Sequence, residues 1–337
     1  MIAQIADRYL GALDAKMREI VDSAPQAPQF NVMLRYPFGW VDEHDRSYNQ
    51  PTGKRIRPTL LLLCAEAVGG DFQTALPAAA AVEILHNFSL VHDDIQDDSD
   101  TRHGRPTVWM LWNRANAINV GDALFSLAFT ALATLQDSGV PPAVTLKCWT
   151  VFNWTCLELT RGQHLDMSFE RQPLVSVDAY ISMIRGKSAA LIAACAQMGA
   201  LIGAHDETTA EHFASFGLNL GIAFQIHDDI LGIWGDEVLT GKSAATDIIS
   251  RKKSLPVLYG LSQSEALTAL YQREAFTDAD VTEAVRLLDE AGAQTYARDI
   301  EVRYYEQAMA DLRAANPQGA AAQGLLGLTE ALFQRQH

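Results

Sequence analysis

Ala79–Pro106 reads AAAVEILHNFSLVHDDIQDDSDTRHGRP, and this stretch decides the fold. It begins as a nearly unbroken apolar segment and ends with five aspartates in eight positions. A helix that is hydrophobic almost all round is normally buried, so these carboxylates emerge from the interior of the protein. Asp93 lies four residues before Asp97, and this spacing predicts that both side chains point into one volume.

An acidic helix end taken alone would be a solvent-exposed face, because surface aspartate is common. A second copy of the pattern makes a site the better interpretation. Gly217–Trp234 is another largely apolar segment, and it carries Asp228 and Asp229. Two buried helices that each end in paired aspartates predict a carboxylate cage across a central cavity. Mg²⁺ is the usual cation held by a few carboxylates together with substrate phosphates.

The composition favours one large helical domain. The chain has 337 residues, 48% of them hydrophobic, and no linker rich in glycine, serine or proline divides it. No run of residues has the alternation and turn signals of β-strands. We therefore expect an all-α fold, a single helical bundle over residues 1–337 with a central active-site cavity.

The charges argue against one class of partner and favour another. A formal net charge of −15 argues against nucleic acid, whose phosphates the average field would repel. The basic residues nevertheless cluster beside glycine- and aspartate-bearing motifs. Carboxylates surrounded by lysine and arginine predict a metal-bridged polyphosphate ligand. These basic positions are Lys54, Arg55 and Arg57; Arg102 and Arg105; Arg185 and Lys187; Lys242; and Arg251, Lys252 and Lys253.

The cysteines and apolar runs bear on location. Cys64, Cys148, Cys156 and Cys195 show no CxxC spacing, which argues against a disulfide or zinc framework and favours a reduced, cytoplasmic setting. The beginning of the chain lacks the pattern of a secretory signal. The most membrane-like run, 189–204, is shorter than the roughly 20 apolar residues that a span needs, so we expect no transmembrane segment.

Several single positions allow either a structural or a chemical role. His86 lies on the helical face of the first aspartates, although a lone histidine on an apolar helix is more often a core residue. Gln163 and Asp166 share a helical face and would form either a structural hydrogen-bonded pair or part of the site. Lys187 opens a small-residue helix, where a positive side chain and a helix N-terminus together form an anion site.

Taken in order, the motifs resemble those of trans-isoprenyl diphosphate synthases of the polyprenyl synthetase family, most closely the short-chain geranylgeranyl diphosphate synthases. The resemblance covers nearly the whole chain. It implies a bundle of the isoprenoid synthase type, a homodimer, and a transferase that joins isopentenyl diphosphate to an allylic diphosphate (dimethylallyl, geranyl or farnesyl). The motifs are GKRIRP (53–58), HNFSLVHDDIQD (86–97), RHGRPT (102–107), GQHLD (162–166), GKS (186–188), FQIHDD (224–229), and TGKSAATDI with KKSLP (240–256).

The resemblance implies a metal-binding role for the aspartates. Asp93 and Asp97 would bind two Mg²⁺ ions and Asp228 a third. Asp94 and Asp229 would support these ligands.

The resemblance also assigns the residues that bind substrate. Arg102, Lys187, Lys242 and Lys252 would hold the allylic diphosphate, and Lys54, Arg57 and His86 would hold isopentenyl diphosphate. The developing allylic cation would be steadied by Gln225 with Lys187 and Ser188.

Three positions depart from the family pattern. His103 stands where a second arginine usually serves isopentenyl diphosphate, and we keep it among the substrate-binding candidates. Gly232 replaces the usual last aspartate of the second motif, and Asp236 is a candidate to supply that charge. Ser188 replaces a threonine and keeps the hydroxyl group.

Product length depends on the wall beside the first aspartates. Leu85 and Ser89 continue the stripe of Asp93 and Asp97, and an aromatic residue at position 89 would stop the growing chain at fifteen carbons. Phe88 resembles the aromatic residue that limits geranylgeranyl-making relatives. We therefore predict a twenty-carbon product.

Two alternatives stay open. A class I terpene cyclase also ionises a prenyl diphosphate with aspartates and Mg²⁺, but it has no use for an acceptor site. A non-catalytic partner subunit should have lost one aspartate pair, whereas both pairs are present here. The primer preference, the downstream pathway and the dimer interface lie beyond the sequence.

Overall fold

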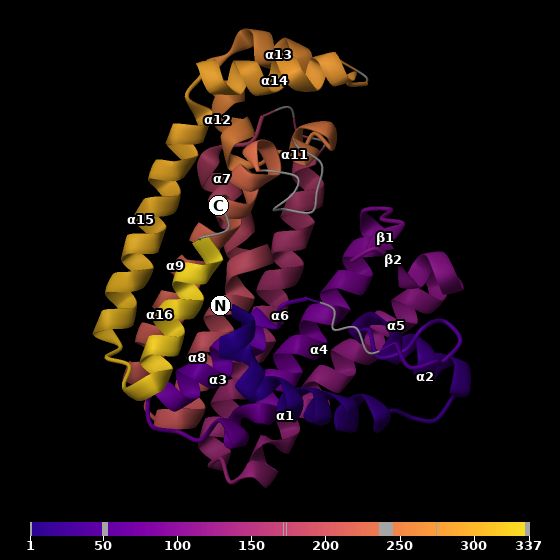
Figure 1. The fold of residues 1–337 in the computed structure, drawn as a ribbon, viewed down its shortest axis with the longest axis vertical. Helices are drawn as coiled ribbons and strands as arrows, with labels where there is room; N and C mark the ends of the chain where they lie inside the picture. Colours follow the sequence, from indigo (N-terminus) through magenta and orange to yellow (C-terminus); the bar gives the residue numbers. More distant parts are fainter. Residues whose placement is uncertain are drawn as a thin grey trace. The chain divides into compact units, whose positions relative to one another are not determined.

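The computed structural model describes residues 2–48, 53–170, 172, 174–235, 245–273 and 275–333. Apart from one short hairpin and an isolated β-bridge, the regular elements in these residues are helices, which confirms the expected all-α class (Figure 1). The elements are α1 (Ile2–Asp22), α2 (Pro28–Arg35), η1 (Tyr36–Phe38), α3 (Ile56–Ala67), α4 (Phe72–Gln96), β1 (Thr101–Arg102), β2 (Arg105–Pro106), α5 (Val108–Ala133), η2 (Thr134–Ser138), α6 (Pro142–Glu170), α7 (Val177–Ile184), η3 (Arg185–Ala189), α8 (Ala190–Ala204), α9 (Glu207–Trp234), α11 (Thr246–Ile249), α12 (Leu255–Gln263), α13 (Glu265–Tyr271), α14 (Asp278–Glu290), α15 (Ala293–Ala314) and α16 (Gly319–Phe333).

The chain forms two compact units. The first comprises residues 1–151, 197–210 and 317–327, and the second comprises residues 152–196, 211–316 and 328–337. The candidate residues of the first acidic motif belong to the first unit, and those of the second acidic motif belong to the second.

Helix α4 is the main support of the first unit, and it packs against α1, α3 and α5 (Figure 1). Its N-terminus is capped by Asp71, whose carboxylate accepts a hydrogen bond from the N–H of Gln73 at 3.0 Å. Four consecutive alanines, 78–81, follow; alanine is the best helix former, and all four are fully buried. The helix therefore runs through the core and brings the aspartates out at its C-terminal end.

Helix α9 has the same function in the second unit. Ile222, Ile226 and Ile230 recur every four residues and pack into one core cluster with Tyr180 of α7 and Leu255 of α12. A second cluster of buried residues joins the end of α9 to α11–α14. These apolar contacts fix the direction in which the polar face of α9 presents its aspartates.

Three helical stretches of the described chain are long and apolar enough to cross a membrane by length and composition: Phe72–Gln96, Val108–Ser138 and Val177–Ala204. In their most apolar windows, 67%, 44% and 61% of the residues, respectively, are buried inside the protein. The first and the third stretches thus use most of their apolar surface for internal packing.

Candidate active site

The first acidic motif lies at the end of α4. Asp93 is partly buried, whereas Asp97 is exposed and forms the C-cap, its N–H donating to the carbonyl of Asp93 at 2.8 Å. The two carboxylates therefore lie one turn apart at the mouth of a buried helix, as the spacing predicts. Asp98 follows the cap with a positive φ of 52° and forms an ion pair with Arg114.

Asp94, the other aspartate of the motif, is almost fully buried, with 4% of its surface exposed. Arg102 of β1 donates to its Oδ1 from Nε at 2.7 Å. Burial raises the pKa of Asp94 above its ordinary value, although the guanidinium of Arg102 opposes this shift. Asp94 is therefore a supporting carboxylate that holds Arg102 beside the motif.

The acceptor-site candidates Arg57 and His86 meet in the first unit. Nη1 of Arg57 on α3 lies 3.2 Å from Nε2 of His86 on α4. Burial, and then the charge of Arg57, lower the pKa of His86 well below its ordinary value, so the ring is neutral at pH 7. Because arginine can only donate, Nε2 accepts and the proton lies on Nδ1.

Lys54 and Arg55, the two basic residues just before α3, differ in exposure and in role. Lys54 is exposed, as a ligand-binding lysine can be. Arg55 is 8% exposed and forms an ion pair with the buried Glu83 of α4. Arg55 therefore links α3 to α4 and does not share the exposure of its neighbour.

The residues of the predicted chain-length wall also lie in the first unit. Leu85 is fully buried, and the hydroxyl of Ser89 donates to the carbonyl of His86 at 2.8 Å. Phe88 packs edge-on against Phe125 of α5, with ring centroids 5.1 Å apart. An aromatic side chain thus lies five residues before Asp93, the first aspartate of the motif.

The hairpin β1–β2 holds the two arginines of RHGRPT apart. Arg102 pairs with Asp94, whereas the guanidinium of Arg105 lies 3.8 Å from the ring centre of Tyr36 and donates to the carbonyl of Val41 at 2.9 Å. Arg105 therefore anchors the hairpin and does not lie beside the carboxylates. His103 is exposed at the turn, and burial followed by the charge of Arg102 lowers its pKa.

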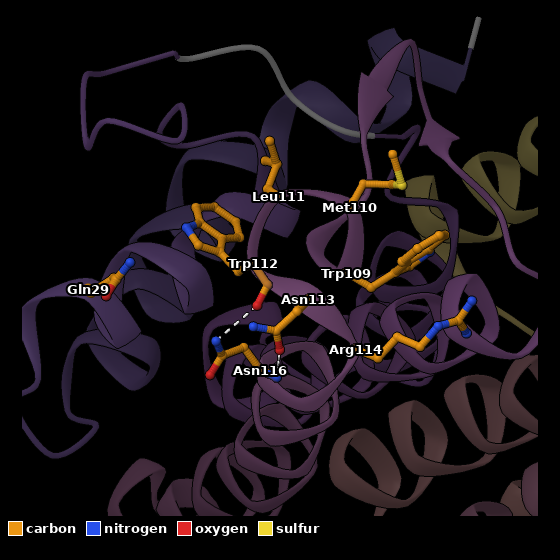
Figure 2. Close-up of a pocket in the computed structure, with 8 residues that line it drawn as sticks. All are labelled: Gln29, Trp109, Met110, Leu111, Trp112, Asn113, Arg114 and Asn116. Atoms are coloured by element: carbon orange, nitrogen blue, oxygen red, sulfur yellow. Dashed lines mark hydrogen bonds between the residues drawn. The ribbon is translucent and has the colours of Figure 1, made fainter.

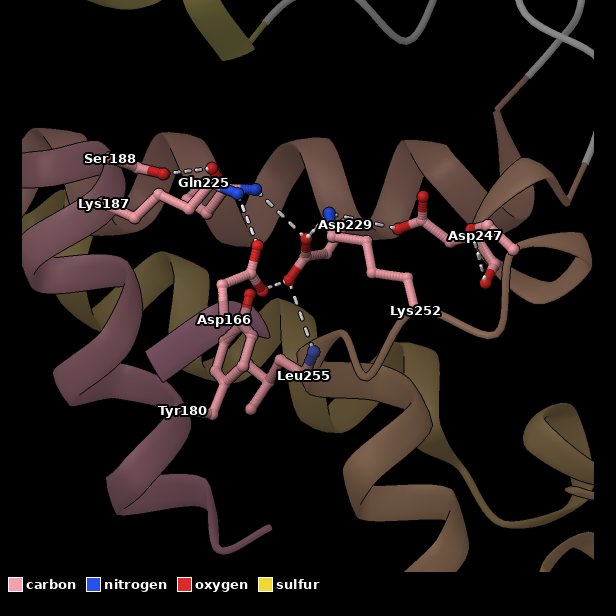
Figure 3. Close-up of polar contacts among 10 residues, drawn as sticks. Asp166, Tyr180, Lys187, Ser188, Gln225, Asp229, Asp247, Lys252 and Leu255 are labelled. Atoms are coloured by element: carbon pink, nitrogen blue, oxygen red, sulfur yellow. Dashed lines mark hydrogen bonds and ion pairs between the residues drawn. The ribbon is translucent and has the colours of Figure 1, made fainter. Parts of the chain in front are cut away.

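The second acidic motif is centred on Asp229, which is fully buried (Figure 3). Its carboxylate accepts from the hydroxyl of Tyr180, from Nε2 of Gln225 at 3.2 Å and from the backbone N–H of Leu255 at 3.3 Å. Lys252 adds an ammonium group 3.2 Å from Oδ1. Asp229 thus organises its surroundings, whereas the neighbouring Asp228 is only partly buried.

Lys187 and Ser188 lie in η3, a π-helical turn between α7 and α8. Such turns are frequent at functional sites. Lys187 forms an ion pair with Asp166 of α6, and the hydroxyl of Ser188 donates to Oε1 of Gln225 at 2.5 Å. Asp166 therefore has a charged partner that the sequence did not identify.

Two glycines bring η3 against α6. A Cβ at Gly162 would lie 2.1 Å from the backbone nitrogen of Lys187, and one at Gly186 would lie 2.6 Å from the carbonyl oxygen of Glu158. Both distances are far below van der Waals contact. The backbones can approach this closely only because both positions lack a side chain.

Lys252 lies between two carboxylates, those of Asp229 and Asp247. Burial alone would lower its pKa, but these carboxylates raise the pKa above its ordinary value. The ammonium group is therefore charged at pH 7. The predicted ligand Lys242 and the candidate Asp236 lie outside the described residues.

The donors in both units fit Mg²⁺. Within the described part of the chain, no group of three or more His, Cys, Asp and Glu side chains could hold a metal ion. Mg²⁺ is usually bound by one or two carboxylates with substrate phosphates and water. Asp93 and Asp97 in the first unit, and Asp228 in the second, offer oxygen ligands of this kind.

A pocket of about 650 Å³ lies elsewhere in the first unit (Figure 2). None of the predicted site residues lines it. It lies where α5 departs from helical geometry at Trp112 and Asn113, the latter with φ 69°. Its lining residues are Gln29, Trp109, Met110, Leu111, Trp112, Asn113, Arg114 and Asn116.

Sequence reasoning missed three polar residues, two in the second unit and one in the first. Tyr180 and Asp247 contact the Asp229 and Lys252 groups, and Glu83 in the first unit neutralises Arg55. Tyr180 gave no signal within its apolar helix. Asp247 lies in the motif TGKSAATDI, in which the resemblance assigns a role to Lys242 and none to the aspartate.

The chain is similar to known prenyl synthases. The family model for polyprenyl synthetase matches residues 39–288. A geranylgeranyl diphosphate synthase of Mycobacterium tuberculosis is 39% identical over 309 residues, covering 90% of this chain and 86% of the relative. A (2E,6E)-farnesyl diphosphate synthase of Mycobacterium bovis is 39% identical over 298 residues, covering 88% and 74%, respectively.

A solved structure agrees with these relatives. The polyprenyl synthetase of Streptomyces coelicolor A3(2) superimposes with a TM-score of 0.90 at 33% identity, covering 98% of this chain and 99% of that one. The motifs, the helical fold and these similarities lead to one conclusion. The chain belongs to the polyprenyl synthetase family and is a trans-prenyltransferase.

Proposed function

We propose that this enzyme condenses isopentenyl diphosphate with an allylic diphosphate and releases geranylgeranyl diphosphate, the twenty-carbon product. The observation that carries the chain-length proposal is the packing of Phe88, five residues before Asp93, on Phe125. A bulky ring there would end the space for a growing prenyl tail. Ser89, with its small side chain, leaves the space above it open.

The reaction follows from the placement of charge. The C1–O bond of the allylic diphosphate breaks, a new carbon–carbon bond forms to isopentenyl diphosphate, and a proton leaves to the released diphosphate. Members of the family depend in general on Mg²⁺, and we propose three ions, held by Asp93, Asp97 and Asp228. Bound Mg²⁺ would neutralise the diphosphate as it leaves.

The chain's own residues would share the remaining work. Arg102, Lys187 and Lys252 would hold the allylic diphosphate, together with Lys242. Lys54, Arg57, His86 and His103 would face isopentenyl diphosphate. The polar pair Ser188 and Gln225 would steady the cation, while apolar walls keep water from it.

A homodimer in the cytoplasm is part of the proposal. Leu146, Trp154 and Leu157 of α6 are 68%, 63% and 52% exposed, although apolar side chains of this size are usually covered. Burial raises the pKa of the Cys148 and Cys156 thiols to about 12, which suits reduced cysteines. We also propose that residues 1–337 act as one catalytic domain.

The test is to incubate the purified chain with isopentenyl diphosphate, Mg²⁺ and each allylic primer, and to size the products. We expect a dominant twenty-carbon diphosphate. A dominant fifteen- or thirty-carbon product would refute the length proposal, and a cyclic hydrocarbon formed without isopentenyl diphosphate would indicate a terpene cyclase.

A further inference from the structure

Gly232 leaves a space on α9 that another residue fills. It lies four residues after Asp228, so a side chain at position 232 would share the face of that aspartate. A Cβ there would lie 2.6 Å from Cγ of Asp247 and 2.7 and 2.9 Å from its two carboxylate oxygens. The carboxyl group of Asp247 therefore occupies the space that any side chain at position 232 would need.

Asp247 is held in this position from α11. Its side chain is 14% exposed, and its Oδ2 lies 3.6 Å from Nζ of Lys252. The backbone N–H of Lys252 also donates to the carbonyl of Asp247 at 2.9 Å. Because Nζ lies 3.2 Å from Asp229 on the other side, one ammonium group is fixed by two carboxylates (Figure 3).

We propose that Asp247 is a positioning residue for Lys252, and that glycine is required at position 232 so that this carboxylate can sit on the bare backbone of α9. The turn of α9 at Gly232 has room for one carboxylate. Asp247 of α11 supplies it, in place of a side chain on α9 itself. The inference rests on the proposed role of Lys252 in binding the allylic diphosphate.

The first test removes the charge and keeps the size. In Asp247→Asn we expect the KM for the allylic diphosphate to rise about tenfold, because Lys252 loses one of its two ion-pair partners. The KM for isopentenyl diphosphate and the melting temperature should stay near their wild-type values. Gly232→Ala should give the same change, because its methyl group displaces the carboxylate, whereas Gly11→Ala, which meets no atom within 4 Å, should not.

The second test moves the carboxylate. Asp247→Gly should weaken binding, and adding Gly232→Asp to it should restore binding, since one carboxylate again lies over this turn. Calorimetric titration with inorganic diphosphate and Mg²⁺ measures this without turnover. Unchanged binding in Asp247→Asn, or no recovery in the double variant, would overturn the inference.

Lys252→Ala separates this inference from the proposed function. If Lys252→Ala weakens diphosphate binding while Asp247→Asn does not, the site stands and the positioning role is wrong. If Lys252→Ala also binds diphosphate as the wild type does, both the proposed role of Lys252 and this inference are wrong.

Discussion

Nη1 of Arg57 lies 3.2 Å from Nε2 of His86, so a guanidinium on α3 donates to a neutral imidazole on α4. This contact fixes the tautomer and leaves the Nδ1–H as the donor of the ring. The buried Nε of Arg57 has no hydrogen-bond partner among the described residues. Both side chains thus retain donors, which suits the binding of an anion.

The depressed pKa of His86 predicts how stability depends on pH. Below about pH 6.5 the unfolded chain binds a proton that the native ring does not, so the free energy of unfolding falls as the pH falls. This contribution reaches at most about 1.4 kcal/mol per pH unit. Urea unfolding at pH 7 and pH 5 should show a smaller loss for His86→Gln than for the wild type. Equal losses would contradict the assignment.

Removing a proposed metal ligand should abolish most of the activity. We expect Asp93→Asn and Asp228→Asn each to lower kcat by on the order of 10² to 10³, because a well-placed charge at the reacting group is lost. The exposed Asp100 in the same acidic run serves as the matched control, and Asp100→Asn should retain near-normal turnover. Steady-state assays at saturating Mg²⁺ would measure this.

Shortening Phe88 should lengthen the product. In Phe88→Ala the ring that packs on Phe125 is gone, and the tail can extend past it. We expect products longer than twenty carbons by chromatography of the hydrolysed alcohols, whereas Phe88→Tyr should keep the wild-type length. An unchanged product in Phe88→Ala would show that the floor lies elsewhere.

The buried pair Arg55 and Glu83 should matter for stability. Both side chains are 6% exposed, so Arg55→Ala leaves a buried carboxylate without its charge partner. Loss of one member of a buried pair costs about 3–5 kcal/mol. Chemical denaturation should reveal this loss, and the exposed pair Arg286 and Glu290 provides the control, since Arg286→Ala should leave the denaturation midpoint nearly unchanged.

Restoring arginine at position 103 tests the departure from the family pattern. The pKa of His103 is lowered, so it carries little charge at pH 7. We expect His103→Arg to lower the KM for isopentenyl diphosphate severalfold and to leave the KM for the allylic substrate unchanged. His44→Arg, at another exposed histidine, should change neither value.

The sequence predicted the helical class and most of the local polar groups. Apolar runs that end in aspartates indicated α4 and α9, and the motif order indicated that Arg57, His86, Ser188 and Gln225 belong to the site. Arg57 with His86, and Ser188 with Gln225, do meet in the structure.

Contacts between residues distant in sequence could not be predicted. Arg105 lies against Tyr36 of η1, which is 69 residues earlier in the chain. Asp247 of α11 lies against Gly232 of α9, and no periodicity of the sequence encodes such a contact. Local patterns fix which face of a helix is polar, whereas tertiary packing selects the partner.

The contact between Gly162 and Gly186 limits how this enzyme can be recombined with its relatives. Neither backbone can accept a methyl group while the other stays in place. A chimaera that takes only one of these two segments from a donor with a larger residue there would push the π-helical turn off α6. Crossover points should therefore fall outside 162–186, so that both glycines are inherited together.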